Sequence, residues 1–207
     1  MKEIYYMGGS PCCGKSTIAE MISERYGFQY YKVDDDLFNF IEKGAEDGDE
    51  WLKYISGMSL DQLWLRNPIT LNEEALITYK KLFPYFIGEL NKLDENTPII
   101  TEGAAFLPFL INELGVDKAH YFYMIPTREF QMKHYLKREW VADYLASCSD
   151  KKTAFTNWME RDVLFATSVR EQAKALGYKG FIVDGSKSIA DTFGLVAEAI
   201  GLVKQCD

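Results

Sequence analysis

The sequence predicts an α/β fold in which a five-stranded parallel sheet is flanked by helices on both faces. Three observations predict it: short apolar runs recur along the chain, longer stretches of helical spacing separate them, and the first run leads into a glycine-containing loop. The candidate strands are residues 3–7, 28–33, 98–101, 119–125 and 180–183. Ligands of such sheets bind at the carboxyl ends of the strands, so the residues that follow each strand are the first candidates for a site.

The first strand runs into a phosphate-binding loop. Residues 9–16 read Gly-Ser-Pro-Cys-Cys-Gly-Lys-Ser and fit the pattern G-x-x-x-x-G-K-[ST]. The glycines let backbone N–H groups point at a polyphosphate, Lys15 supplies charge for the β- and γ-phosphates, and Ser16 supplies a hydroxyl for Mg²⁺. A helix is expected over residues 15–26, before Gly27 as its cap. The candidate nucleotide-binding residues are Gly9, Ser10, Pro11, Cys12, Cys13, Gly14, Lys15, Ser16 and Thr17.

The two adjacent cysteines of this loop are an unusual choice. A helix N-terminus lowers the pKa of a thiol, which favours redox sensitivity of Cys12 and Cys13, while the simpler interpretation is that these positions need small side chains. With Cys148 and Cys206 they form neither a disulfide framework nor a metal-binding spacing, so we expect reduced thiols.

Acidic residues follow the second strand. Asp34, Asp35 and Asp36 come directly after residues 28–33, at the sheet edge expected to carry the phosphate loop. One of them, with Asp34 or Asp36 as the candidates, is expected to accept the proton of an acceptor hydroxyl and to contact the substrate, and Asp36 is also a candidate magnesium ligand. The alternative is that these residues cap the next helix and complement its dipole.

The interval 37–94 is too long for a simple crossover, and its apolar spacing predicts several helices on the substrate side. Within it, Trp64 and Arg66 are candidates to line an acceptor pocket, although tryptophan at a helical position more often belongs to the core.

The third strand ends in another acidic residue. Glu102 and Gly103 follow it, and both are candidate substrate contacts. Glu102 is also a candidate to hold Mg²⁺, and the glycine allows the chain to turn close to a ligand. The alternatives for Glu102 are a helix cap or a pair with Lys15.

A second long helical interval follows the fourth strand, and we expect a lid over residues 127–161. A polar break at 147–152 divides it, and a helix is expected over 157–176. Arg138 and Arg161 lie beside the break and are the candidate catalytic cations, since a closing lid can deliver guanidinium charge to a phosphate. The alternative is a solvated surface with salt bridges.

Length and composition indicate one folded unit over residues 1–207. A chain of 207 residues with 47% hydrophobic residues can bury a sizeable core. No apolar stretch approaches the roughly 20 residues that span a bilayer, so we expect a cytoplasmic protein with no membrane partner. The net charge of −8 argues against nucleic acid as a partner, because phosphate backbones bind to basic surfaces. A monomer and a homodimer both stay open.

Taken in chain order, these residues resemble the P-loop small-molecule kinases, which include nucleoside monophosphate kinases, shikimate and gluconate kinases and chloramphenicol phosphotransferase. The likeness covers residues 9–17, the strand-end acids, the Glu102-Gly103 turn, the arginine-bearing lid and a last strand followed by Asp184-Gly185-Ser186. It implies a three-layer P-loop NTPase fold with a helical substrate insertion and a lid. It also implies that Gly185 and Ser186 lie near the adenine.

The resemblance further implies an ATP- and Mg²⁺-dependent kinase that transfers the γ-phosphoryl group to a small hydroxyl or phosphate acceptor. Asp34-x-Asp36 is similar to the D-x-D of shikimate kinases, but their Gly-Gly pair after the third strand is missing, which disfavours shikimate. The N-K-x-D sequence that GTPases use occurs at residues 91–94, within the substrate-side interval and before the third strand, which disfavours a role in recognising a base and hence a GTPase. The alternative is an ATP-binding regulatory protein that hydrolyses slowly and phosphorylates no small molecule.

Overall fold

A five-stranded sheet with the strand order β2-β3-β1-β4-β5 forms the centre of the computed structural model, which describes residues 2–202. The strands are β1 (Ile4–Gly9), β2 (Gln29–Lys32), β3 (Ile99–Glu102), β4 (Tyr121–Pro126) and β5 (Lys179–Val183). All four pairings are parallel. The predicted fold class is therefore confirmed, with β4 starting later than expected because Lys118–His120 forms a 3-10 turn.

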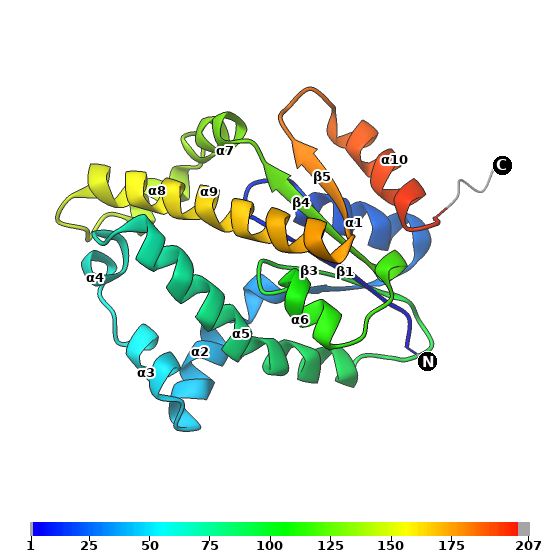
Figure 1. Ribbon diagram of the computed structural model, residues 1–207, viewed down its shortest axis with the longest axis horizontal. Helices are drawn as coiled ribbons and strands as arrows, with labels where there is room; N and C mark the ends of the chain where they lie inside the picture. The colour runs from blue at the N-terminus through cyan, green and yellow to red at the C-terminus, as the bar shows by residue number, and fades with distance from the viewer. Residues whose placement is uncertain (1, 203–207) are drawn as a thin grey trace.

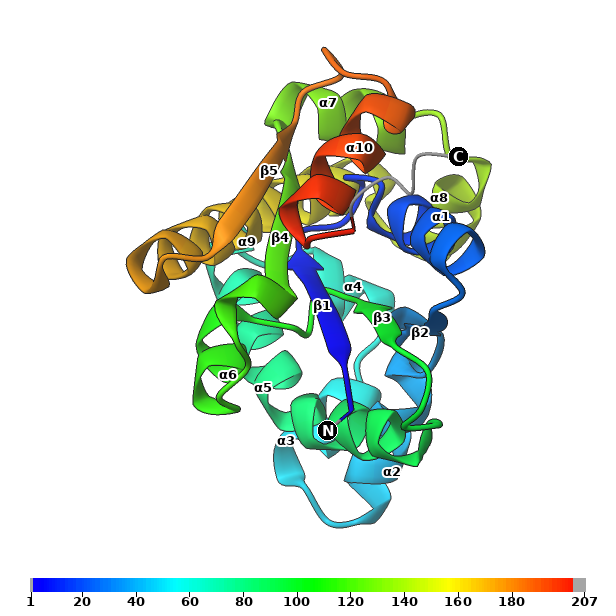
Figure 2. The same ribbon diagram turned by 90° about the vertical axis from the view of Figure 1, so that its right-hand side faces the viewer.

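Helices cover both faces of the sheet (Figures 1 and 2). On one face lie α1 (Lys15–Tyr26) and α10 (Ile189–Ala199), and on the other lie α5 (Pro68–Lys92), α6 (Pro108–Glu113) and α9 (Lys151–Leu176). Side chains of β1 alternate between the two cores: Met7 packs under α1 and α10, and Tyr6 packs toward α5 and α6. Burial on both faces explains why the inner strands read as continuous apolar runs.

The remaining helices gather near the carboxyl ends of the strands (Figure 1). After the 3-10 turn Val33–Asp35, the interval 37–94 contains α2 (Leu37–Glu46), α3 (Glu50–Ser56), α4 (Leu60–Trp64) and α5. The interval 127–161 contains α7 (Arg128–Tyr135), α8 (Glu139–Tyr144) and the start of α9. The helix α9 begins at Lys151 and not at residue 157, because Asp150 caps it by accepting from the Thr153 N–H. Within residues 2–202, no helix combines the length and apolar character that a membrane crossing requires.

A close backbone approach joins the ends of three strands. The N–H of Gly103 donates to the carbonyl of Met7 at 3.1 Å, which brings the turn after β3 against β1. A Cβ atom at Gly103 would lie 2.7 Å from Cβ of Val33, at the end of β2. Only glycine therefore allows the turns that carry Asp34 and Glu102 to pack this closely.

Gly103→Ala should lower the free energy of unfolding by about 1–3 kcal/mol, because the new methyl group overlaps the buried Val33 side chain. Gly88→Ala is the matched control: its Cβ meets nothing within 4 Å, and alanine favours the α5 helix by up to about 1 kcal/mol. Urea unfolding measures both values. Equal stability of the two variants would contradict the close approach.

Candidate active site

The phosphate loop is held in shape by contacts that exclude larger residues. Gly9 has φ +123°, and a Cβ atom there would lie 1.8 Å from the carbonyl oxygen of Met124. Gly14 has φ +82° and precedes α1, where no side chain caps the helix in the described structure. Cys12 also adopts a positive φ, of 67°. The first N–H groups of α1 are thereby left for an anion, as phosphate binding requires.

Lys15 is buried and lies within this loop. Its side chain is 7% exposed, and Nζ donates to the carbonyl oxygen of Ser10 at 2.8 Å. Burial lowers the pKa of Lys15, but the neighbouring Cys13, Glu102 and Asp34 outweigh burial, so that the pKa lies above its ordinary value. Lys15 therefore carries its positive charge at neutral pH.

Glu102 lies beside Ser16 at the carboxyl end of β3. The residue is 1% exposed, and Oε1 accepts from Ser16 Oγ at 2.9 Å and from Tyr30 Oη at 3.1 Å. Burial raises the pKa of Glu102, while Lys15 and the two hydrogen bonds oppose the shift. A hydroxyl and a carboxylate beside a phosphate loop fit Mg²⁺, which takes its other ligands from water and phosphate oxygens.

Tyr30 was not among the predicted site residues. It lies on β2, and its pairing with Ile100 places its hydroxyl within reach of Glu102. Strand alternation predicts on which face of the sheet Tyr30 lies. It does not predict which strand lies next to β2, so the contact between Tyr30 and Glu102 could not be predicted from the sequence.

The three aspartates after β2 have separate environments. Asp34 is exposed and directly follows Val33, whose side chain lies against the Gly103 turn, and its negative charge adds to the raised pKa of Lys15 and of Glu102. Asp35 pairs with Lys32 at 3.2 Å.

Asp36 accepts from Tyr31 Oη at 2.9 Å and occupies the cap position of α2 without a side-chain cap bond. No contact among the described residues brings Asp36 to Ser16 or Glu102, as its predicted metal role requires, because its carboxylate faces Tyr31.

The helix α9 lies against the phosphate loop. Ser10 Oγ donates to the backbone oxygen of Asp162 at 3.3 Å. The Asp162 side chain is 1% exposed and accepts from Tyr135 Oη at 3.3 Å. Arg128 of α7 pairs with Glu160 of α9. The lid interval is thus tied to the loop through α9.

The two predicted cations of the lid differ in exposure. Arg138 is exposed, with its guanidinium carbon 5.0 Å from the Tyr135 ring centroid, and its charge partly opposes the rise that burial causes in the pKa of Cys12. Arg161 is largely buried, with its guanidinium carbon 5.0 Å from the ring centroid of Trp64. Arg138 therefore lies over the aromatic rings of the lid, whereas Arg161 lines a neighbouring cavity.

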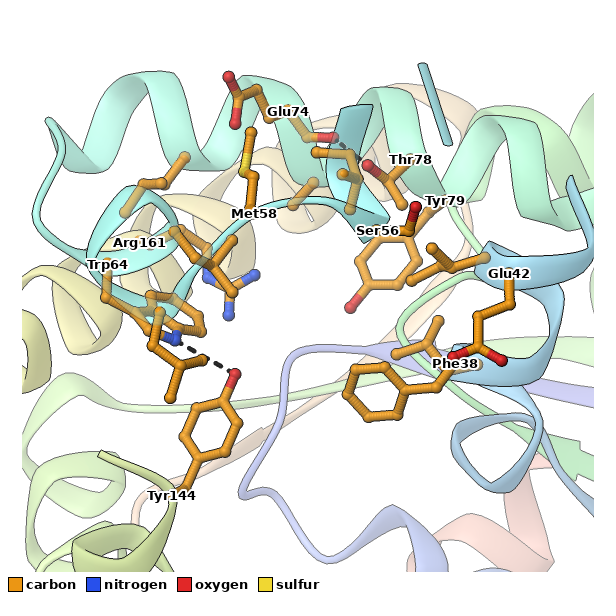
Figure 3. A pocket seen from close by; sticks show the side chains of 17 residues that line it. Phe38, Glu42, Ser56, Met58, Trp64, Glu74, Thr78, Tyr79, Tyr144 and Arg161 are labelled. Atoms are coloured by element: carbon orange, nitrogen blue, oxygen red, sulfur yellow. Dashed lines mark hydrogen bonds between the residues drawn. The ribbon is translucent and has the colours of Figure 1, made fainter. Parts of the chain in front are cut away.

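That cavity has a volume of about 340 Å³ and lies among α2, α3, α4 and α5, with Tyr144 of α8 and Arg161 of α9 in its wall (Figure 3). Its lining is mostly apolar, and Trp64 lines it as expected. Arg66 does not line it. Its Nη1 and Nη2 instead donate to the two carboxylate oxygens of Glu74 at 2.7 and 2.5 Å. The structure thus leaves Arg66 supporting Glu74 and does not bring it to an acceptor.

The loop after β5 lies near the start of α7. Gly185 has φ +86°, and a Cβ atom there would lie 3.1 Å from the ring of Phe130. Asp184 Oδ1 accepts from the N–H of Ser186 at 2.8 Å, which fixes the turn. Gly14 is close to Ile189 at the start of α10. The helix that follows this turn therefore begins beside the phosphate loop, and the contact of Gly185 and Ser186 with a base stays a prediction.

Burial outweighs the effect of the helix N-terminus on the two thiols of the loop, and both are free as expected. Burial raises the pKa of Cys12 and of Cys13, and the opposing charges of Arg138 and Lys15 do not offset it. Cys13 Sγ donates to the carbonyl oxygens of Ser10 and Met124 at 3.1 and 3.2 Å. Both thiols are therefore protonated at neutral pH. Cys148 is also a free thiol, and Cys206 lies outside the described residues.

Comparison with known proteins adds to this geometry. No family model and no curated protein sequence matches the chain. Among solved structures, TT1252 from Thermus thermophilus matches with a TM-score of 0.52 and 15% identity over 98% of each chain. An uncharacterized protein from Eubacterium ventriosum matches with a TM-score of 0.51 and 12% identity, over 98% of this chain and 100% of its own. A gluconokinase from Sinorhizobium meliloti matches with a TM-score of 0.48 and 14% identity, over 97% of this chain and 92% of its own.

At these identities the likeness concerns the fold alone. The phosphate loop between β1 and α1, at the carboxyl edge of a parallel sheet ordered β2-β3-β1-β4-β5, decides the fold class. The chain has a P-loop NTPase fold. The P-loop, Ser16 and Glu102 form one half of the candidate site, and the cavity beside Arg161 forms the other.

Glu102→Gln should stabilise the protein, by an amount that grows with pH. Because the pKa of Glu102 is higher in the folded than in the unfolded chain, its contribution to stability is fully present below the unfolded value, near 4.5, and is lost as pH rises through the folded value. Glutamine keeps an acceptor for Ser16 and Tyr30 but does not ionise. The advantage of the variant should therefore grow above about pH 4.5 and level off above the folded pKa.

Urea unfolding at several pH values without nucleotide measures this difference. Glu95→Gln, at an exposed loop position, corrects for the loss of one negative charge. An advantage that shrinks as pH rises would show that the attraction of Lys15 outweighs burial, contrary to this account.

Proposed function

We propose that the protein is an ATP-dependent kinase that transfers the γ-phosphoryl group to the hydroxyl of a small acceptor. The observation that carries the proposal is the junction of two sites: a P-loop with buried Lys15 and the Ser16–Glu102 pair, and beside it a cavity of about 340 Å³. A nucleotide-binding protein without an acceptor has no need of such a cavity, whose volume suits a small molecule.

Each residue has a role that follows from its place. The N–H groups of the P-loop and Lys15 would hold the β- and γ-phosphates, and Thr17 would support the α- and β-phosphates. Ser16 and Glu102 would hold Mg²⁺, which when bound supplies charge to neutralise the phosphate oxygens. Tyr30 orients Glu102 through their hydrogen bond. The turn at Gly185 and Ser186 would lie against the base.

Transfer itself requires positioning and a proton acceptor. Asp34 would accept the proton of the acceptor hydroxyl, because it follows β2 at the sheet edge that carries the P-loop, and Leu37, three residues later, lines the cavity. Arg138 would add positive charge from the lid as the γ-phosphoryl group moves. Burial of Lys15 and Glu102 would strengthen their charge interactions with a bound phosphate and cation.

An acceptor screen tests the function directly. ATP consumption is measured with added hydroxylated acids, nucleosides, nucleotides and sugars, with Lys15→Ala as the variant that should lose ATP binding. Consumption that rises with one compound supports the kinase. Tight ATP binding with only slow, acceptor-independent hydrolysis across the whole screen would favour a regulatory ATP-binding protein in its place.

Asp34→Asn should lower kcat by about a hundredfold or more and leave the Kd for ATP within about threefold, because general base catalysis contributes 10²–10⁴-fold. Asp35→Asn is the matched control. It removes the same charge at the next residue, whose side chain pairs with Lys32 on the surface. Single-turnover kinetics with the acceptor found in the screen measure the rates. If the two variants lost the same fraction of the rate, Asp34 would not be the general base.

A further inference from the structure

One end of the cavity presents hydrogen-bond donors without acceptors. Arg161 Nε is sealed from solvent and makes no hydrogen bond within residues 2–202, although it lies 2.8 Å from Asp162 Oδ1. Its terminal nitrogens also bond to no described residue, and Figure 3 shows the guanidinium in the cavity between Trp64 and Tyr79. A largely buried guanidinium with free donors favours an anionic ligand.

Two phenols extend this set of donors. Tyr79 lines the cavity, and its hydroxyl makes no hydrogen bond to another described residue. Tyr144 Oη accepts from Trp64 Nε1 at 3.2 Å, which leaves its own proton free to be donated. The face of the Trp64 ring holds the guanidinium plane in place by a cation–π contact. Three donors thus converge on one place before any ligand binds.

The carboxylates of the cavity do not compete for Arg161. Glu74 has both oxygens engaged by Arg66. Glu42 lies at the opposite end of the cavity in Figure 3. Asp162, next in sequence, pairs with Arg161 through Nε at 2.8 Å, and burial raises the pKa of its carboxyl. None of the described hydrogen bonds joins the terminal nitrogens of Arg161 to a carboxylate.

We infer that the cavity binds an acceptor that carries a carboxylate or phosphate group on an apolar body, and that Arg161 binds this anionic group. Calling the ligand an acceptor rests on the proposed kinase function. The apolar wall formed by residues such as Leu37, Ile41 and Leu63 would cover the body of the ligand. Neutral compounds of the same shape would leave the donors of Arg161 unpaired, which is costly in a buried site.

Arg161 lines the cavity, whereas Lys15 donates to the Ser10 carbonyl within the P-loop. Leu37 and Phe38, which follow the three aspartates, also line the cavity, and Figure 3 shows Phe38 at the end away from Arg161. A ligand anchored at Arg161 would thus extend toward the proposed base.

Binding of simple probes to the protein without ATP tests this inference. Benzoate and phenyl phosphate carry the two anions on an apolar ring, and benzyl alcohol is the neutral counterpart. Isothermal titration should show that benzoate or phenyl phosphate binds at least tenfold more tightly than benzyl alcohol, and the tighter of the two identifies the anion. Binding of benzyl alcohol as tight as that of both anions would overturn the inference.

Variants locate the anion. Arg161→Met should weaken the preferred anion at least tenfold and change ATP binding by less than threefold. Arg170→Met, at an exposed position of the same helix, should change neither. Arg161→Lys and Tyr79→Phe should each weaken binding of the anion partially. These two variants replace Arg161→Met in the test where Arg161→Met does not fold. If Arg161→Met lost more affinity for ATP than for the anion, this arginine would belong to the nucleotide site and the inference would be overturned.

Lys15→Ala separates the inference from the proposed function. This variant should lose the ability to bind ATP and should still bind the anionic probe with unchanged affinity. Anion binding that depends on Arg161 supports the cavity assignment even where no acceptor is phosphorylated. Anion binding that disappears in Lys15→Ala but persists in Arg161→Met would place the probe in the P-loop and contradict the inference.

Discussion

Two buried opposite charges at the start of α1 are the constraint on which the site depends. Lys15 is 7% and Glu102 is 1% exposed, and none of the described hydrogen bonds joins them. Lys15 donates to the Ser10 carbonyl, and Glu102 accepts from Ser16 and Tyr30. Removing charges from water is costly, and the mutual attraction of Lys15 and Glu102 together with these neutral partners offsets only part of that cost, since the pKa of Glu102 stays raised. A polyphosphate and its cation would supply the missing counter-charges, so this part of the fold is prepared for such a ligand.

The helix α9 connects this charge pair to the cavity. The backbone of Asp162 contacts Ser10 in the P-loop, while the side chain of the preceding residue, Arg161, enters the cavity. Trp158, one turn earlier, stacks on Trp64 with ring centroids 5.0 Å apart. One turn of a single helix therefore contributes to both halves of the site. The packing of α4 on α9 holds the two halves of the site in place relative to each other. A hydrogen bond supports this packing, in which the Asn157 side chain of α9 donates to the Trp64 carbonyl at 2.9 Å.

Most of the fold could be predicted because its signals are local. The strand ends lie within two residues of the expected ones, and α1 spans Lys15–Tyr26 as expected, with Gly27 at φ +72° as its cap. Side-chain partners were harder. Whether Asp36 faces Ser16 or Tyr31 depends on how the turn after β2 packs, and the Arg66–Glu74 pair depends on how α4 meets α5. The thiol pKa shifts depend on burial, which the loop pattern alone does not give.

A crystal structure with Mg²⁺ and a non-hydrolysable ATP analogue tests the central claim most directly. The account predicts the β- and γ-phosphates on the N–H groups of the P-loop and on Lys15, the cation on Ser16 Oγ with Glu102 beside it, and the γ-phosphate facing the cavity near Asp34. An analogue bound away from the P-loop, or a γ-phosphate pointing away from the cavity, would contradict it.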